Sequence, residues 1–203
     1  MKWRKLSKIL RSILSNFNAR KILNLGVSVE KVEEGLKAIE YSNVTTVQII
    51  FNLFRQRPSE LFFKEAQKRD IGIIARVPLA SGLLTGLFNP QTTFEKEDHR
   101  NFNRNGEAFD KGETFSGINY ALGLKAVQEL KALFPETANL APIALQWILC
   151  FKEISCIIPG ASKESLVLSN LSVYDLPKLT DDKIAAMNAI YERYIKPEVH
   201  QLW

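Results

Sequence analysis

The feature that most constrains the fold is an alternation of short apolar segments with helical segments. Four apolar segments occur along the chain, at residues 22–28, 45–51, 72–77 and 155–158, and residues with helical periodicity follow each of them. The segment at 45–51, TTVQIIF, is rich in β-branched residues, as is typical of a strand buried on both faces. Strands that alternate with helices form parallel sheets with right-handed crossovers. We therefore predict four parallel strands in sequential order, with the helices outside them.

The helical segments carry signals at their ends. Ser59, which follows Pro58, is suited to cap one helix. Pro142 fits the first turn of another helix, and Thr180 is suited to cap a third. We predict helices over residues 29–40, 60–69, 120–133, 142–151, 162–171 and 180–195.

The number of strands bounds the architecture. Four strand–helix units make half of a (β/α)8 barrel or a small doubly wound sheet, since a full barrel needs ~250 residues and this chain has 203. Residues 86–118 form a long irregular stretch in which Phe94, Phe102, Phe109 and Phe115 recur. A loop of this length is usually functional or disordered. The recurring aromatic residues favour an extended loop that lies over the carboxyl end of the sheet.

The composition excludes several classes of protein. Hydrophobic residues make up 46% of the chain and charged residues 24%, which is typical of a soluble globular protein and excludes collagen, wholesale disorder and a disulfide scaffold. No apolar run reaches the ~18 residues of a membrane-spanning helix. Cys150 and Cys156 lie in apolar stretches, which favours a reducing compartment, so we expect a cytoplasmic protein.

The positive charge is concentrated at the start of the chain. Lys and Arg number 27 against 22 Asp and Glu, and every charged residue before Glu30 is basic. Nucleic-acid-binding proteins usually spread a basic stripe over a folded face, so we expect no nucleic-acid partner. Residues 1–19 also carry apolar residues at helical spacing, at Trp3, Leu6, Ile9, Leu10, Ile13, Leu14 and Phe17. Three hypotheses stand for this segment: an amphipathic helix docked on the domain, non-native sequence at the start of a truncated reading frame, or a membrane-surface or targeting helix.

Glycine-containing turns follow the last two predicted strands. Residues 78–86, PLASGLLTG, follow the strand at 72–77, and residues 160–163, GASK, follow the strand at 155–158 and open a helix. A glycine-containing turn at a helix N-terminus exposes backbone N–H groups that suit phosphate oxygens. Barrels commonly bind phosphate in the loops after their last two strands. Both turns are therefore candidate phosphate-binding segments.

Several motifs together resemble one known family. They are GVSVEKVEEGL at 26–36, VQIIFNLFR at 47–55, ARVPLASGLLTG at 75–86, HRNFNR at 99–104, ALQWIL at 144–149 and IPGASK at 158–163, with Asn170. By their order and spacing, residues 20–195 resemble the C-terminal half of an aldo-keto reductase. The resemblance implies an α/β fold in which residues 20–203 supply strands five to eight of a (β/α)8 TIM barrel. It also implies an NADPH-dependent reduction of a carbonyl substrate to an alcohol.

The resemblance implies a cofactor site residue by residue. Ser28 and Gln48 match positions that hydrogen-bond the nicotinamide carboxamide, and Arg76 matches a position that stacks on the nicotinamide ring. The match continues along the pyrophosphate loop with Val77, Pro78, Leu79, Ser81, Gly82 and Leu84. Around the adenosine phosphate and the adenine it gives Gly160, Ser162, Lys163 and Asn170, of which Lys163 would supply positive charge. Two positions depart from the family pattern, because Val29 stands in place of Asn and Leu166 in place of Arg or Gln.

The catalytic tetrad of the family, Asp, Tyr, Lys and His, lies in the first half of the barrel, outside the matched part. We expect neither His99 nor His200 to replace it, and two His with two distant Cys give no metal-ligand spacing. Three functions stay open. The chain is the cofactor-binding half of a reductase, a non-catalytic nucleotide-binding or self-associating module, or a truncated product without independent activity.

Four strands taken from a barrel leave two strand edges unpaired, and unpaired edges favour self-association. The inward side chains also lose the opposite wall of the barrel core. Val47, Ile49, Ile73 and Ile157 are among the candidates for that exposed surface, and the alternation of the strands leaves their faces unassigned. A carbonyl compound is the expected small-molecule partner of a complete enzyme.

Overall fold

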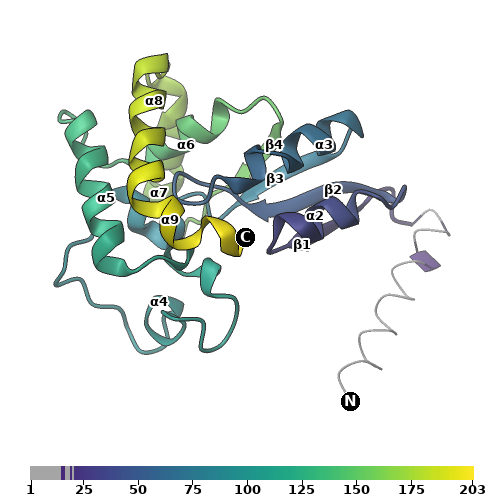
Figure 1. Ribbon diagram of the computed structural model, residues 1–203, viewed down its shortest axis with the longest axis horizontal. Helices are drawn as coiled ribbons and strands as arrows, with labels where there is room; N and C mark the ends of the chain where they lie inside the picture. The colour runs from purple at the N-terminus through teal and green to yellow at the C-terminus, as the bar shows by residue number, and fades with distance from the viewer. Residues whose placement is uncertain (1–14, 17–18, 20) are drawn as a thin grey trace.

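A single parallel sheet is the frame of the molecule. The computed structural model describes residues 15–16, 19 and 21–203. The strands are β1 (Leu25–Val29), β2 (Val44–Ile50), β3 (Gly72–Arg76) and β4 (Ile154–Ile158). They are parallel and lie in the order β1-β2-β3-β4 (Figure 1). The predicted number, order and direction of the strands are therefore confirmed. The helix expected over residues 1–19 falls outside the described residues, apart from 15, 16 and 19.

Helices lie between these strands and after the last of them. They are α2 (Val32–Ala38), α3 (Phe62–Lys68), α4 (His99–Phe102), α5 (Tyr120–Leu133), α6 (Ala141–Leu149), α7 (Glu164–Leu171), α8 (Asp181–Ile190) and α9 (Lys196–Val199). A π-helical turn, Tyr191–Ile195, joins α8 to α9. Helix α2 contacts β1 and β2, α3 contacts β3, and α6 contacts β4. No helix among the described residues is long and apolar enough to cross a membrane.

Two of the three predicted helix ends are confirmed and one is wrong. Pro142 lies in the first turn of α6, and the Thr180 hydroxyl accepts a hydrogen bond from the backbone N–H of Lys183. Ser59 does not cap α3, which begins at Phe62 without a side-chain cap. Pro58 and Ser59 instead lie in a short 3-10 turn, Arg57–Ser59, in which the Ser59 hydroxyl donates a hydrogen bond to the carbonyl of Gln56 at 2.7 Å.

The two faces of the sheet differ sharply. On the helix side, Val47, Ile49 and Ile73 are fully buried, so these three candidates for the exposed surface are wrong, and Ile157 is half-buried. Successive side chains of a strand point to opposite faces, so an error of one residue exchanges the faces. The uncovered face carries their neighbours instead, including the register row Ser28, Gln48, Ile74 and Cys156.

An aromatic cluster fills the core on the helix side. Phe51, which follows β2, lies 4.7 Å from Phe63 and 5.2 Å from Trp147, measured between ring centroids. Phe151 packs edge-on against the Phe51 ring at 4.9 Å. Edge-to-face aromatic pairs of this kind each add ~0.5–1.5 kcal/mol beyond the burial of their area. The cluster ties α3 and α6 to the end of β2.

The long segment 86–118 crosses the carboxyl end of the sheet, as predicted. It contains one α-helix, α4, and two 3-10 turns, Lys111–Glu113 and Phe115–Gly117. The Glu113 carboxylate pairs with Arg76 at the end of β3, and Ser116 hydrogen-bonds Asn52, which follows β2.

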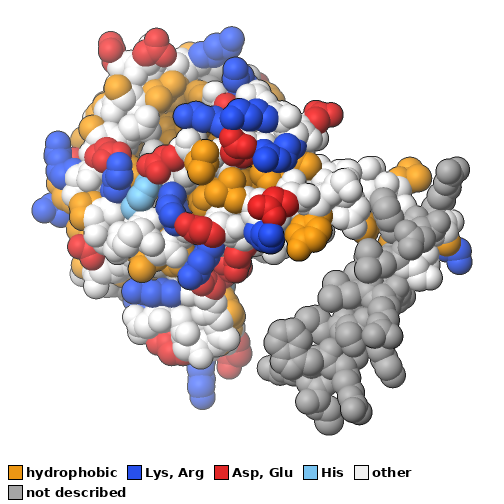
Figure 2. All heavy atoms as spheres, turned by 45° about the vertical axis from the view of Figure 1, so that its right-hand side comes forward, with side chains coloured by type: hydrophobic (Ala, Val, Ile, Leu, Met, Phe, Trp, Pro, Cys, Tyr) orange, Lys and Arg blue, Asp and Glu red, His pale blue; other side chains and the backbone are white. Residues whose placement is uncertain are grey.

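Acidic and basic side chains are interspersed on the face shown in Figure 2, with no continuous basic stripe.

Helix α7 differs from the other described helices of its length because it buries no residue. Its side chains Leu166, Val167, Leu168 and Leu171 are between 41% and 59% exposed. They extend the uncovered surface beyond β4, which pairs only with β3 in the described chain. The apolar side of α7 therefore continues an unpaired strand edge.

We expect the chain, produced as these 203 residues, to self-associate. The free edges of β1 and β4 expose unpaired backbone groups, and α7 adds exposed leucines. Light scattering should give a mass above the 23.1 kDa of one chain. Leu168→Lys should reduce the association, whereas Leu61→Lys, in the turn before α3, should not. A monodisperse monomer with cooperative melting would contradict this expectation.

Candidate functional site

A cavity of about 980 Å³ opens at the carboxyl ends of β3 and β4. It lies between the turn after β3, the segment 86–118 and the turn after β4. Its volume is at the upper end of the ~300–1,000 Å³ usual for small-molecule sites. Of the residues that the family resemblance points to, the cavity is lined by Arg76, Val77, Pro78, Leu79, Ser81, Gly82, Gly160, Ser162 and Asn170.

The turn after β3 owes its shape to an unusual backbone. Val77, Ala80, Ser81 and Gly82 all have positive φ, of 50°, 47°, 56° and 92°. A β-branched residue such as Val77 is strained in this region, at a cost of ~1–3 kcal/mol. Gly82 is required for space as well, because a Cβ there would lie 2.9 Å from the ring of Phe88. The turn therefore brings bare backbone to the cavity wall.

Arg100 provides a fixed positive charge in the cavity wall. Its Nε donates to Oδ1 of Asp98 at 2.9 Å, and its Nη2 donates to the other carboxylate oxygen. The guanidinium lies over the ring of Phe94, 4.6 Å from its centroid. Its Nη1 lies 3.6 Å from the position that a Cβ on Gly82 would occupy. Arg100 belongs to the motif at 99–104, but sequence reasoning did not single it out.

Electrostatics keep this ion pair charged. Hydrogen bonds from Arg100 lower the pKa of Asp98 to about 2. The same contacts raise the pKa of Arg100 above its usual value. Two donors of the guanidinium are used by Asp98, so its orientation toward the turn is set before any ligand binds.

Arg76 reaches the cavity, but carboxylates hold it. Its Nη2 lies 2.6 Å from the carboxylate of Glu30, which follows β1, and its Nη1 pairs with Glu113. Burial raises the pKa of Glu30, Arg76 opposes this rise, and the nearby Glu113 adds to it. The Ser81 hydroxyl donates to the backbone carbonyl of Glu113 at 2.8 Å. Arg76 is therefore a cross-link between two loops as well as a lining residue.

Four of the residues implied by the resemblance lie outside the cavity lining. Gln48 Nε2 donates to Ser28 Oγ at 3.1 Å on the uncovered face of the sheet. Leu84 belongs to the turn after β3, and its side chain is buried in the core. Lys163 is exposed at the N-cap of α7. The structure thus separates a pair on the sheet from the set around the cavity.

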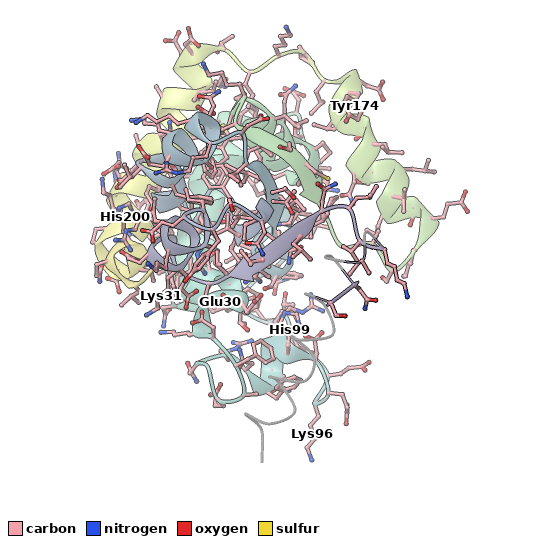
Figure 3. The ribbon with its side chains drawn as sticks, turned by 90° about the vertical axis from the view of Figure 1, so that its right-hand side faces the viewer. Glu30, Lys31, Lys96, His99, Tyr174 and His200 are labelled. Carbon is pink, nitrogen blue, oxygen red and sulfur yellow. The ribbon has the colours of Figure 1, made fainter. Side chains whose placement is uncertain are left out.

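The two histidines lie in different places. His99 lines the cavity and lies 3.6 Å from the carboxylate of Asp98, a position that sequence reasoning did not anticipate. His200 bonds the hydroxyl of Tyr191 at 2.6 Å and lies 3.1 Å from Glu60. Figure 3 shows His99 on the loop near Glu30 and His200 on the opposite flank. Within the described residues, no three His, Cys, Asp or Glu side chains gather in a way that could hold a metal ion.

Comparisons with known proteins give the family of the chain. A model of the aldo/keto reductase family matches residues 14–192. Aldo-keto reductase str7 of Strobilurus tenacellus is 28% identical over 177 residues, which cover 85% of this chain and 49% of that protein. The uncharacterized oxidoreductase YqkF of Bacillus subtilis is 25% identical over 151 residues, covering 74% of this chain and 44% of that protein. The chain thus spans about half the length of these curated relatives.

Solved structures show the same relation. The glycerol dehydrogenase AKR11B4 from Gluconobacter oxydans superposes with a TM-score of 0.68 and 27% identity, over 91% of this chain and 54% of that one. The apo form of the aldo-keto reductase AKR11C1 from Bacillus halodurans, at 17% identity, gives a TM-score of 0.64 over 97% of this chain and 60% of that one. The second likeness bears on the fold alone. The four strands and their helices are those of a TIM-barrel protein.

The Asp98–Arg100 pair predicts a specific pH dependence of stability. An aspartate pKa of about 2 in the folded chain lies below the ~3.9 of an unfolded chain. The pair therefore stabilises the fold above about pH 4, and this contribution is lost as the pH falls toward about 2. Thermal unfolding should show a smaller loss of stability over this range for Asp98→Asn than for the native chain.

A matched control uses an aspartate that forms no ion pair in the described chain. Asp175→Asn should keep the native pH dependence, since Asp175 is exposed in the turn after α7. Parallel curves for the native chain and Asp98→Asn would contradict the prediction.

Proposed function

The chain belongs to the aldo/keto reductase family, and we propose that it supplies the cofactor-binding part of an NADPH-dependent reductase of carbonyl compounds. The observation that carries the proposal is the cavity at the ends of β3 and β4. Nine of the residues that the family resemblance implies for the cofactor line it together. They come from the end of β3 and the turn after it, and from the turn after β4 together with α7, which are far apart in the sequence, so the fold is what assembles them.

The chemistry of the cavity fits a dinucleotide phosphate. Gly82 leaves backbone where a side chain would block the wall, and Arg100 faces this turn with its orientation fixed by Asp98. Ser162, just before α7, and Asn170, in the last turn of α7, add neutral polar groups to the cavity wall. Charged donors to phosphate form stronger hydrogen bonds than neutral ones. NADPH would supply the hydride for the reduction, and the residues of this chain would bind and orient it.

A second candidate function is a nucleotide-binding or self-associating module without catalysis. The clamp on Arg76 favours it, because Glu30 and Glu113 engage the side chain that the resemblance places against the nicotinamide ring. A truncated product without activity is the third. We expect the protein in the cytoplasm, where its two free cysteines, Cys150 and Cys156, would stay reduced.

The proposal predicts that the purified chain binds NADPH. A fluorescence titration should show saturable binding, and NADH should bind more weakly because it lacks the additional phosphate. Arg100→Leu should weaken NADPH binding about tenfold or more, since a charged hydrogen bond contributes ~1.5–3 kcal/mol. Gly82→Val should weaken it as well, because the wall would then carry a side chain.

Lys96→Leu is the matched control for Arg100→Leu. Lys96 lies on the same loop but is exposed and points away from the site (Figure 3), so its removal should leave NADPH binding unchanged. A folded chain that binds neither NADPH nor NADH would overturn the proposed function. Equal losses in both variants would show that net charge of the loop, not the position of Arg100, determines binding.

We also predict that these 203 residues alone do not turn over a carbonyl substrate. The resemblance places the acid–base tetrad outside the matched part, and loss of a general acid typically costs ~10²–10⁴-fold in rate. NADPH oxidation should therefore not increase when a carbonyl compound is added. Robust oxidation that requires the carbonyl compound and is reduced by Arg100→Leu would contradict this prediction.

A further inference from the structure

Trp203 occupies a slot made for an aromatic ring. The side chain is only 4% exposed. A Cβ on Gly112 would lie 2.9 Å from its ring, and one on Gly117 would lie 2.7 Å from it. Any residue larger than glycine at these two positions would collide with the indole. The 3-10 turns of the segment 86–118 are therefore built around this ring.

Below the ring lies a buried charge. Arg55, which follows β2, is 1% exposed, and its guanidinium carbon lies 4.0 Å from the centroid of the Trp203 ring. Its Nη2 donates to the backbone carbonyl of Glu30, while Nε and Nη1 have no hydrogen-bond partner among the described residues. Burial lowers the pKa of Arg55 to about 10. The aromatic face and the nearby carboxylates of Glu30, Asp110 and Glu113 together compensate for a cation removed from water.

The slot continues into the cavity wall. Gly112 and Gly117, which touch Trp203, flank Glu113 in the sequence. Glu113 lines the cavity, pairs with Arg76 and accepts a hydrogen bond from Ser81 on its backbone carbonyl. The backbone N–H of Phe115 donates to the same Ser81 hydroxyl at 3.3 Å. Residues 110–117 therefore lie between Trp203 on one side and the turn after β3 on the other.

The neighbouring residues hold Trp203 in place. His200 bonds the hydroxyl of Tyr191 and lies 3.1 Å from Glu60, so the chain just before Trp203 is anchored to two other elements. These contacts fix the backbone before Trp203, so its ring stays packed against residues 110–117. Neither Trp203 nor Arg55 belongs to the positions that the family resemblance assigns to the cofactor.

We propose that Trp203 and Arg55 are positioning residues, which stack on each other to hold residues 110–117 in the wall of the cofactor cavity. The consequence for function, that the stack maintains the affinity for NADPH, rests on the proposed function. The structural claim, that the stack holds residues 110–117 in place, rests only on the contacts of Trp203 with Arg55, Gly112 and Gly117. Without the stack, Glu113 would lose the support that keeps it against Arg76 and against Ser81 of the turn after β3.

The test combines hydrogen–deuterium exchange of the full chain without ligand with an NADPH titration. Trp203→Leu keeps apolar bulk but removes the aromatic face, whereas Trp203→Phe keeps an aromatic face. Exchange of the amides in 110–117 should rise about tenfold in Trp203→Leu, as expected for the loss of a buried cation–π contact. It should change little in Trp203→Phe, and amides of β2 and α6 should be unaffected in both.

Two further variants sharpen the test. Arg55→Lys keeps the charge but loses the planar group that stacks, so it should reproduce the Trp203→Leu result. Leu202→Ala alters the adjacent residue, which is 43% exposed, and should leave the exchange of 110–117 unchanged. In the titration, Trp203→Leu and Arg55→Lys should weaken NADPH binding by a factor similar to the change in exchange.

The outcomes separately test the stack, its positioning role and the proposed function. Unchanged exchange of 110–117 in Trp203→Leu, an equal rise in β2 and α6, or identical behaviour of Trp203→Phe and Trp203→Leu would each overturn the stack. The expected exchange with unaltered NADPH affinity would overturn the positioning role. The expected exchange in a chain that binds no NADPH at all would support the stack and reject the proposed function.

Discussion

One buried side chain, that of Asn52, joins three segments on which the site depends. Its amide nitrogen donates to the carbonyl of Val77 at 2.9 Å and contacts the Ser116 hydroxyl at 3.2 Å, and its carbonyl oxygen accepts from the backbone N–H of Phe54 at 2.8 Å. Each buried polar group left without a partner costs ~1–3 kcal/mol. The tie from β2 to Val77 helps to hold the left-handed backbone of the turn after β3. The tie to Ser116 holds the long segment over the sheet.

The sequence predicts the strands of the sheet but not which side chains lie on which face. The short apolar runs that alternate with helical segments are a local signal, so the four strands and their order were predictable from the residues. The face of the sheet on which Val47 or Ile73 lies depends on the register of strand pairing. A strand that is apolar on both faces does not show its register in its sequence. The start of α3 shows the same limit. Ser59 lies in the 3-10 turn with Pro58 and donates its hydroxyl to the carbonyl of Gln56, so it does not cap the helix that it precedes.

The candidate site was predictable to the extent that it is local. The two glycine-containing turns carry their own signature, and the structure brings both to one cavity. Arg100 and Glu113 escaped prediction, because their roles depend on where the long loop crosses the sheet. The motif HRNFNR at 99–104 was the available signal for Arg100. Trp203 lies far in sequence from Arg55, and nothing near either residue indicates their contact.

The connection between β3 and β4 has a consequence for the order in which the sheet forms. Residues 30–43 and 51–71 separate the first three strands, whereas residues 77–153 separate β3 from β4. Closing a longer loop costs more chain entropy before any strand contact compensates it, and non-local pairing is slow. β4 is therefore the strand whose pairing is slowest. During synthesis β1, β2 and β3 leave the ribosome before β4, and the edge of β3 stays unpaired until β4 reaches it.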